Sequence, residues 1–396
     1  MVGLALMLTV AWTARSAELV AGKLTGIEIV DREKSRTTIA CDDAKIGLAP
    51  YVWKCSRTGA AARAEATMPG AYLKLAFHDS RTIKLLIDGT ANQACPDSSM
   101  PIVEYSVDKG PWKVKQPAKT EELYPLSLAE GLDAGGEHRA EIYFRAGNLG
   151  PKRWESSTVH LRIAGTQLDA GGSLVPIALR PQRAIGFGDS ITEGVCVEGL
   201  CSYYDNLLMN NARITWFPIV CAALECEYGQ LGTGGQGMVR TNIQIPPLPQ
   251  TWDHYDATTS RLTNGLLLPE PDYVFCEMGT NDFEGDDRKR KQMDITAAYA
   301  GWLSAMRKAC PHARFFCIVP PLGWHAAEVH AAVTFRNKAG DQKVDLIDTA
   351  PLKAGFRAGE GATTLAYDGV HPSVYGNAML GALIAVEAQK MISHKD

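Results

Sequence analysis

The chain has 396 residues, of which 46% are hydrophobic and 21% are charged, and its formal net charge is −4. This is ordinary globular composition with enough apolar material for a sizeable core, and the length allows two or three domains. A nucleic-acid-binding chain usually carries a dominant basic stripe, and none is present, so the charge pattern argues against that class. The dense charge run at 286–291 mixes both signs, and we interpret it as the solvated start of a helix.

The chain begins with an apolar run at residues 2–14, followed by the small residues Ala14, Ser16 and Ala17. The run is shorter than the roughly 20 residues that cross a bilayer, and it resembles the hydrophobic part of a secretory signal, although it lacks a positively charged start. We therefore expect a signal peptide at residues 1–17 and a secreted or periplasmic protein. No later segment is apolar for long enough to cross a membrane.

From residue 18 to about 178 the pattern is short and period-two, with turn signals between the runs. Alternating runs predict strands at 73–77, 82–87, 103–107, 112–115, 140–144 and 158–163. Several short strands separated by such turns are typical of an all-β sandwich, here of jelly-roll-like type. No long helix is predicted in this N-terminal domain.

The period changes within the proline-containing stretch 175–182, so we place a second domain at residues 179–396. Apolar runs predict strands at 183–187, 226–231, 272–278, 313–319 and 343–347. Helical spacing predicts helices at 214–224, 294–308, 326–336 and 374–392. Strands that alternate with helices indicate parallel βαβ units and hence an α/β domain with a sheet covered on both faces.

A serine stands where the first of these strands meets a helix, in the segment GFGDSITEG at 186–194. At such a turn Ser190 can present its hydroxyl and its backbone N–H to the same pocket. The segment is not the GxSxG elbow of α/β-hydrolases, because Thr192 stands where that motif needs glycine. Taken alone, Ser190 would be read as a helix N-cap.

A glycine-rich segment, LGTGGQG at 231–237, follows the next strand and formally contains the GxGxxG dinucleotide fingerprint. That motif should open a helix, but the proline-rich stretch 246–249 follows too soon for one. We interpret the segment as bare backbone whose N–H groups approach a ligand oxygen. Gly235 is our first choice for such a donor, and Gly237 is the competitor.

Two further segments complete a set of complementary groups. Asn281 follows a strand in MGTND and can direct its amide N–H into a cleft as an oxyanion donor, or can be a plain turn residue. Asp368 and His371 lie three residues apart in YDGVHP, before the last helix, and can meet across one turn or form a surface turn. Together with Ser190 they supply a nucleophile, a general base, a group that fixes the base's tautomer, and oxyanion donors.

At these residues the chain resembles the SGNH (GDSL-type) hydrolase superfamily, whose blocks carry Ser, Gly, Asn and His in this order. The resemblance covers roughly residues 183–396 and rests on GDSIT, the glycine-rich segment, GTND and DGVHP. It implies a flavodoxin-like three-layer fold and hydrolysis with no metal or other cofactor. It also implies Ser190, Asp368 and His371 as the catalytic triad, with the N–H groups of Ser190, Gly235 and Asn281 as the oxyanion hole.

A narrower resemblance covers the whole chain. A β-sandwich followed directly by an SGNH domain is similar to the two-domain acetyl-esterases of carbohydrate esterase family 2, and the segments at 105–108, 128–132 and 137–139 are similar to their sandwich. Those enzymes remove O-acetyl groups from plant polysaccharides; some lack the triad aspartate, which this chain has in Asp368. The resemblance implies an acetylated carbohydrate as substrate. The alternatives are a lipase- or thioesterase-like hydrolase of longer acyl esters and a non-catalytic carbohydrate-binding protein.

Other features are given less weight. Among the ten cysteines, Cys41–Cys55 and Cys196–Cys201 are candidate disulfides, plain buried thiols are the alternative, and no zinc-type spacing occurs. His325, Glu328 and His330 form HxxExH and not the HExxH of zinc proteases. Four aromatic residues in or near predicted site loops could contact a sugar ring or belong to the core: Tyr203, Tyr204, Trp252 and Trp324.

Overall fold

The computed structural model describes residues 36–56, 58–120, 122–147, 154–155, 159–200, 207–241, 245–282 and 288–393. The expected signal peptide at 1–17 lies outside the described residues, as do Cys201, Tyr203 and Tyr204. The residues Thr37–Asp396 form one compact unit. None of the helices in the described part of the chain is long and apolar enough to cross a membrane.

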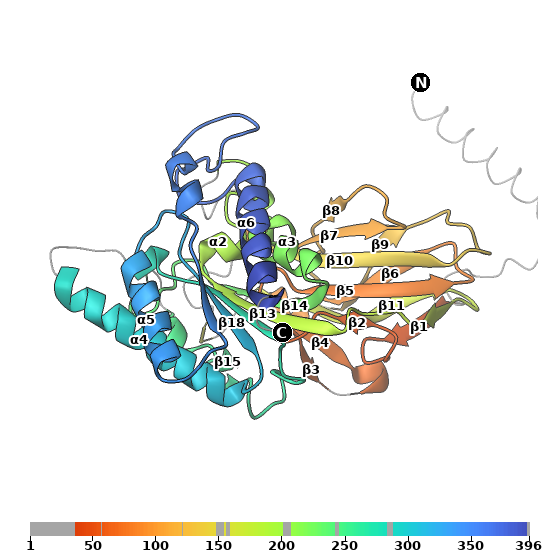
Figure 1. Ribbon diagram of the computed structural model, residues 1–396. Helices are drawn as coiled ribbons and strands as arrows, with labels where there is room; N and C mark the ends of the chain where they lie inside the picture. The colour runs from red at the N-terminus through yellow and green to blue at the C-terminus, as the bar shows by residue number, and fades with distance from the viewer. Residues whose placement is uncertain are drawn as a thin grey trace, which may run out of the picture. The chain divides into compact units, whose positions relative to one another are not determined.

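The N-terminal part consists of two six-stranded sheets (Figure 1). The first has the order β3-β4-β11-β6-β9 with β1 beside β11, and the second the order β12-β5-β10-β7-β8 with β2 beside β5. The strand bounds are β1 (Arg36–Ala40), β2 (Gly47–Leu48), β3 (Lys54–Ser56), β4 (Arg63–Ala66), β5 (Tyr72–His78), β6 (Ile83–Asp88), β7 (Ile102–Val107), β8 (Lys113–Lys115), β9 (Leu123–Ala129), β10 (His138–Ala146), β11 (Leu161–Asp169) and β12 (Ser173–Val175). Among the described residues of this part, the helices are short 3₁₀ turns.

Alternation of side chains explains how these strands build a sandwich. At the start of β10, Arg139 and Glu141 are exposed, whereas His138, Ala140 and Ile142 are buried. Successive side chains of a strand point to opposite faces of the sheet, so one face can join the apolar core while the other meets water. The sequence therefore specifies which face of β10 is buried.

The α/β part is built on a five-stranded parallel sheet of order β14-β13-β17-β18-β19. Its strands are β13 (Gln182–Gly188), β14 (Cys226–Gly232), β17 (Tyr273–Glu277), β18 (Arg314–Ile318) and β19 (Val344–Ile347), and a two-stranded ribbon of β15 (His254–Asp256) and β16 (Thr259–Ser260) lies between β14 and β17 in the chain. In chain order this is the 2-1-3-4-5 arrangement of flavodoxin-like folds, which confirms the predicted fold class.

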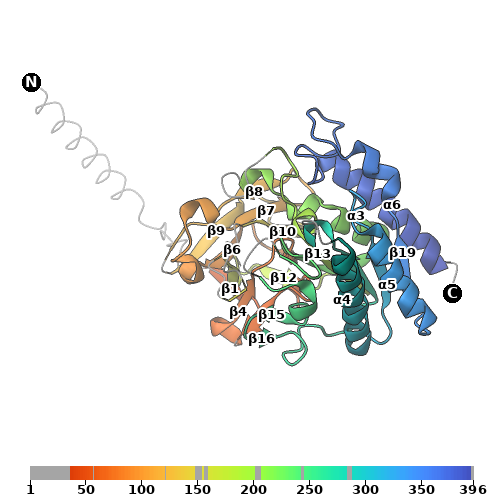
Figure 2. The ribbon, with the colours of Figure 1, turned by 90° about the vertical axis from the view of Figure 1, so that its left-hand side faces the viewer.

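Two pairs of helices cover this sheet. The helices are the one-turn α2 (Ser190–Glu193), α3 (Trp216–Ala223), α4 (Arg288–Ala309), α5 (Ala326–Lys338) and α6 (Val374–Ser393). α3 packs with α6 and α4 packs with α5 (Figures 1 and 2). The first strand, β13, has its next strand β14 on one side and the following strand β17 on the other. An open α/β sheet places its ligand site where the strand order reverses in this way, at the carboxyl ends of β13 and β17.

Buried charged residues connect the sandwich to the α/β part. On β10, Arg145 is 4% exposed and its guanidinium donates to Glu104 of β7 at 3.3 Å and to Glu198 at 2.6 Å. It also donates to the carbonyl oxygens of Leu208 and Asn210 at 2.6 and 3.1 Å. Glu198 and these two carbonyls belong to the segment that follows Ser190. The sandwich thus helps to hold a loop beside the candidate site.

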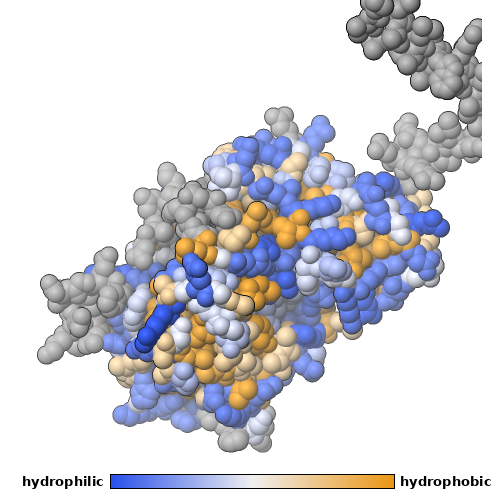
Figure 3. All heavy atoms as spheres, turned by 90° about the horizontal axis from the view of Figure 1, so that it is seen from above, coloured by the Kyte–Doolittle hydropathy of each residue, from blue (hydrophilic) through white to orange (hydrophobic). Residues whose placement is uncertain are grey.

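Of the two candidate disulfides, Cys41–Cys55 is not formed, because both residues are free thiols. Cys196 is disulfide-bonded, while the other candidate partner, Cys201, lies outside the described residues. Figure 3 shows a surface on which apolar patches are surrounded by hydrophilic side chains. Along α6 the exposed apolar residues are Val374, Tyr375, Met379 and Val386.

Candidate active site

Ser190 is the first residue of α2, directly after β13 has ended at Gly188. The preceding Asp189 caps this short helix, because its Oδ1 accepts the N–H of Ile191 at 2.9 Å. Since the first N–H groups of a helix have no partner within it, the N–H of Ser190 is not used by α2 itself. The N-cap is therefore Asp189 and not Ser190, whose hydroxyl remains available for another role.

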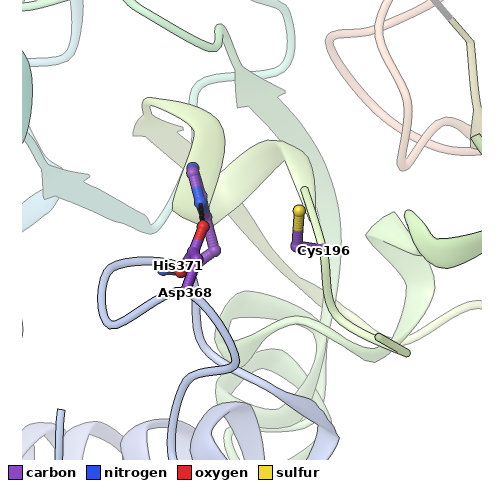
Figure 4. Close-up of side chains that lie close together, drawn as sticks. All are labelled: Cys196, Asp368 and His371. Carbon is purple, nitrogen blue, oxygen red and sulfur yellow. Dashed lines mark hydrogen bonds and ion pairs between the residues drawn. The ribbon is translucent and has the colours of Figure 1, made fainter. Parts of the chain in front are cut away.

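His371 brings its imidazole to this hydroxyl from the loop before α6. Its Nε2 lies 2.8 Å from Ser190 Oγ, and its Nδ1 lies 2.5 Å from Asp368 Oδ2. The second oxygen of Asp368 accepts the backbone N–H groups of His371 and Val370 at 2.8 and 2.9 Å. Figure 4 shows the imidazole and carboxylate side by side on this loop. The structure thus brings together Ser190, His371 and Asp368 in one continuous chain of contacts.

The surroundings of Asp368 keep it ionised. Partial burial acts to raise its pKa, but the hydrogen bond and charge of His371 and the two backbone N–H groups outweigh burial and hold the pKa at about 2. An ionised carboxylate at Nδ1 favours the tautomer that carries its proton on Nδ1. In that tautomer Nε2 is free to accept the proton of a serine hydroxyl.

The glycine-rich segment forms a tight turn after β14. The N–H of Gln236 donates to Thr233 O at 3.1 Å, and between them Gly235 adopts φ = +78°. A positive φ at this position of the turn favours glycine. Gly235 is partly exposed, whereas Gly237 is buried. The N–H of Gly235 has no hydrogen-bond partner within the described residues, so it remains available to a ligand.

Asn281 links the two sides of the site. It follows β17, and its Nδ2 donates to Gln236 O at 2.9 Å and to Asp189 Oδ2 at 3.2 Å. The amide therefore lies between the residue after Gly235 and the residue before Ser190. Both of its hydrogens are engaged here, so an incoming oxyanion would have to replace the longer bond, the one to Asp189.

Sequence reasoning gave no role to two buried acids beneath Ser190. Burial raises the pKa of Asp189 to about 6, against the opposing effects of the Ile191 N–H and of His371. Burial and the neighbouring Asp189 raise the pKa of Glu277, at the end of β17, well above its ordinary value. Within the described residues, Glu277 Oε1 has no hydrogen-bond partner. The sequence signal for these two acids is an acidic residue within an otherwise apolar strand end, in GFGDS and in FCEMG.

Cys196 lies close to Asp368 and His371. Its Sγ lies within 4.8 Å of ligand atoms of both Asp368 and His371, and Figure 4 shows it approaching from the segment after α2. The three could suggest a metal centre. However, Cys196 is disulfide-bonded and its sulfur is not a thiolate ligand. The chemistry of this donor set therefore does not fit a metal ion.

The remaining candidates take no part in the chain of contacts from Asp368 through His371 to Ser190. His325 and Glu328 face each other at 3.7 Å at the start of α5, and no cluster of metal-ligating atoms among the described residues includes His325 or His330. Trp252 is buried, at 7% exposure, and belongs to the core. Trp324 is half-buried in the loop between β18 and α5.

Comparison with known proteins finds a family whose model matches part of the chain. Residues 187–379 match the model of the GDSL-like Lipase/Acylhydrolase family. Over 278 residues the chain is 26% identical to the cellulase/esterase CelE of Acetivibrio thermocellus, covering 67% of this chain and 31% of that protein. Over 167 residues it is 27% identical to an acetylxylan esterase / glucomannan deacetylase of Cellvibrio japonicus, covering 37% of this chain and 40% of that protein. The matches thus span less than half the length of either relative.

Solved structures share the whole architecture. A family two carbohydrate esterase from Cellvibrio japonicus superposes with a TM-score of 0.70 at 17% identity, covering 91% of this chain and 98% of its own. A family two carbohydrate esterase from Clostridium thermocellum, solved with cellohexaose, gives a TM-score of 0.66 at 19% identity, covering 88% and 99%. At this identity the likeness establishes the fold, a sandwich joined to a parallel α/β sheet.

Proposed function

We propose that this chain is a serine carboxylic-ester hydrolase that removes acetyl groups from carbohydrates. The match of residues 187–379 to the model of the GDSL-like Lipase/Acylhydrolase family supports this proposal. The observation that carries the proposal is the chain of contacts from Asp368 Oδ2 through the His371 imidazole to Ser190 Oγ, at 2.5 and 2.8 Å. These are the distances at which a base can take a proton from a nucleophile.

The proposed mechanism has two halves. Ser190 Oγ attacks the ester carbonyl while His371 Nε2 takes its proton, and His371 returns that proton to the departing sugar oxygen. This leaves an acetyl group on Ser190. Water then attacks the acetyl carbonyl, His371 takes the proton of that water and returns it to Ser190 Oγ, and acetate leaves. Asp368 stays ionised throughout and stabilises the imidazolium that forms twice in each cycle.

The negative charge that develops on the carbonyl oxygen needs donors fixed in advance. We assign this role to the N–H groups of Ser190 and Gly235 and to the side-chain amide of Asn281. Among the described residues, two of these donors have no hydrogen-bond partner to give up. They are the N–H of Ser190, the opening residue of α2, and the N–H of Gly235 in a partly exposed turn. Asn281 would exchange its 3.2 Å bond to Asp189 for the oxyanion.

The substrate class is supported by what the chain resembles. Its relatives are described as a cellulase/esterase and as an acetylxylan esterase / glucomannan deacetylase, and family two carbohydrate esterases share its fold. These likenesses favour an O-acetylated oligo- or polysaccharide over a lipid ester. A secreted or periplasmic location, with residues 1–17 removed as a signal peptide, agrees with a polymeric substrate that cannot enter cells.

A panel of esters tests this proposal. The panel contains acetylated oligosaccharides and p-nitrophenyl esters from acetyl to octanoyl, and kcat/KM is measured for each. Acetyl esters should be cleaved far faster than octanoyl esters, and acetylated oligosaccharides should release acetate. Faster cleavage of octanoyl esters would support a lipase- or thioesterase-like hydrolase instead. Binding of the oligosaccharides without any acetate release would support a non-catalytic carbohydrate-binding protein.

A further inference from the structure

We define the glycine-rich loop as residues 232–240. A single buried carboxylate binds its C-terminal part. Asp282 accepts three successive backbone N–H groups of this loop: Oδ2 accepts that of Met238 at 2.8 Å, and Oδ1 accepts those of Val239 and Arg240 at 2.8 and 3.1 Å. Asp282 is 1% exposed. Successive N–H groups converging on one anion fix the backbone in a concave shape, so the course of the loop depends on this carboxylate.

A second buried carboxylate binds the N-terminal part of the same loop. Glu193, the last residue of α2, accepts the N–H of Gly234 at 2.6 Å and is 6% exposed. A side chain at Gly232 could not be accommodated, because its Cβ would lie 2.3 Å from the N atom of Glu193. The loop therefore lies directly against the helix that begins with Ser190.

The loop residues that the two carboxylates bind lie on either side of Gly235 in the sequence. Glu193 binds the residue before it, and Asp282 binds the three residues that follow Gly237. Buried charge is costly unless it is hydrogen-bonded, and here each carboxylate accepts at least one backbone N–H group of the loop that contains Gly235.

The identity of residue 237 follows from the same contact. A Cβ at Gly237 would lie 2.6 Å from Asp282 Oδ1 and 2.6 Å from the carbonyl oxygen of Arg240. Such distances are below van der Waals contact, so a side chain there would displace the carboxylate or the backbone it holds. Residue 237 is therefore a glycine because the Asp282 carboxylate occupies the space of a side chain. Of the two candidate oxyanion donors, Gly235 and Gly237, only Gly235 is partly exposed.

We propose that Asp282 and Glu193 are positioning residues, which hold the Gly235 N–H where it meets the oxyanion of the transition state. The inference rests on the proposed function, since it concerns the same reaction. A donor misplaced by about 1 Å can cost about 10²-fold in rate. Because a fixed donor acts mainly on charge that develops during attack, its loss should appear in kcat more than in KM.

Asp282→Asn and Glu193→Gln test the two carboxylates directly. In Asp282→Asn an amide NH₂ must face at least one loop N–H, so the loop should shift. We expect kcat for p-nitrophenyl acetate to fall by about 10²-fold and KM to change by less than about threefold. The Ki of a boronic acid, which forms a tetrahedral anion on the serine, should rise in parallel with the loss of kcat. A purely structural role would lower the melting temperature without moving that Ki.

Asp256→Asn is the matched control. Asp256 also accepts two backbone N–H groups, those of Thr258 and Thr259 at 2.9 and 2.8 Å, but it does so on the β15–β16 ribbon. It forms an ion pair with Lys54 as well, so the variant can lose stability. We expect its kcat and boronate Ki to stay at wild-type values. This control separates loss of stability from loss of positioning.

Gly237→Ala tests the position of the loop independently, because it leaves Asp282 and Glu193 in the sequence and places a methyl group against the Asp282 carboxylate. We expect the same fall in kcat with little change in KM. Gly301→Ala is its control, since a Cβ at Gly301 on α4 meets nothing within 4 Å. The double variant Asp282→Asn/Glu193→Gln should lose less than the product of the two single losses, because both act through one loop.

The outcomes separate this inference from the proposed function. An inactive wild type would contradict the proposed function itself. An active wild type whose Asp282→Asn and Gly237→Ala variants are folded and keep kcat and boronate Ki within about threefold would overturn the positioning role alone. If Asp282→Asn fails to fold, Gly237→Ala and Glu193→Gln still decide the question by the same two readouts.

Discussion

His371 Nε2 lies 2.8 Å from Ser190 Oγ, although 181 positions separate the two residues in the chain. The parallel sheet explains this contact, because β13 ends at Gly188 and the loop before α6 returns to the same edge. A serine that merely capped a helix would not need an imidazole at its hydroxyl. The contact is the reason for treating Ser190 as a nucleophile.

Ser190→Ala should abolish esterase activity and leave the fold intact. The hydroxyl is the only group in the constellation placed to attack a carbonyl, so we expect kcat to fall by about 10⁴-fold or more. Initial rates with p-nitrophenyl acetate and the circular dichroism melting curve check both statements. Ser393→Ala, at the exposed end of α6, is the control and should retain full activity. Near-native turnover by Ser190→Ala would mean that another residue attacks.

Asp368→Asn should lower kcat on the order of 10⁴-fold, because an amide no longer holds His371 in the productive tautomer. Its stability should also depend on pH. The folded pKa of Asp368 is about 2, below the ordinary value of 3.8, so the ionised form stabilises the fold above pH 3.8 and this stabilisation disappears as the pH falls through about 2.

The expected gap in the free energy of unfolding between wild type and Asp368→Asn is about 2 kcal/mol at neutral pH. The gap should narrow as the pH falls below about 4. Urea unfolding at a series of pH values measures it. A gap that is constant with pH would contradict the ionised pair.

Asn281→Ala should lower kcat by about 10²–10³-fold with little change in KM, the size expected when one oxyanion donor is removed. The variant also removes the bonds to Gln236 O and Asp189, so part of the loss can come from the loop. Asn264→Ala on the exposed chain near β16 serves as the comparison. A rise in KM at constant kcat would show that Asn281 binds the ground state instead.

Glu277→Gln should raise the melting temperature at pH 7. The folded pKa of Glu277 lies above its ordinary value of 4.5, so the folded state prefers the protonated acid and stability falls as the pH rises past 4.5. A neutral amide of the same shape avoids this cost. The gain should vanish near pH 4, and the exposed Glu130→Gln should show none. A lower melting temperature of Glu277→Gln at pH 7 would contradict the buried neutral acid.

Much of the α/β part could be predicted from the sequence, because its strands and helices are long and strongly periodic. The predicted helix at 326–336 is α5 at Ala326–Lys338, and the predicted strand at 226–231 is β14 at Cys226–Gly232. In the sandwich, β1, β2, β3, β4, β9 and β12 were missed. Of these, β3, β9 and β12 lie at sheet edges, where a strand is short or only partly buried and its alternation is weak. β4 lies between β3 and β11, but its four residues are too few for a clear alternation.

The candidate site divides in the same way. Ser190, Asn281, Asp368 and His371 stand in short motifs whose residue types indicate their chemistry. The interactions of Asp282 and Glu193 could not be predicted, because a carboxylate that accepts backbone N–H groups leaves no periodic pattern in the sequence. Cysteine pairing is equally hidden, since Cys41 and Cys55 have a plausible spacing and are nevertheless free thiols.

The most direct test of the central claim is to trap the acyl-enzyme. Wild-type protein turning over an acetylated oligosaccharide is quenched in acid, digested and examined by mass spectrometry. The account predicts one added acetyl group on the peptide that contains Ser190, and none in Ser190→Ala. Acetate release without any acetylated peptide, or acetyl groups on a different residue, would contradict it.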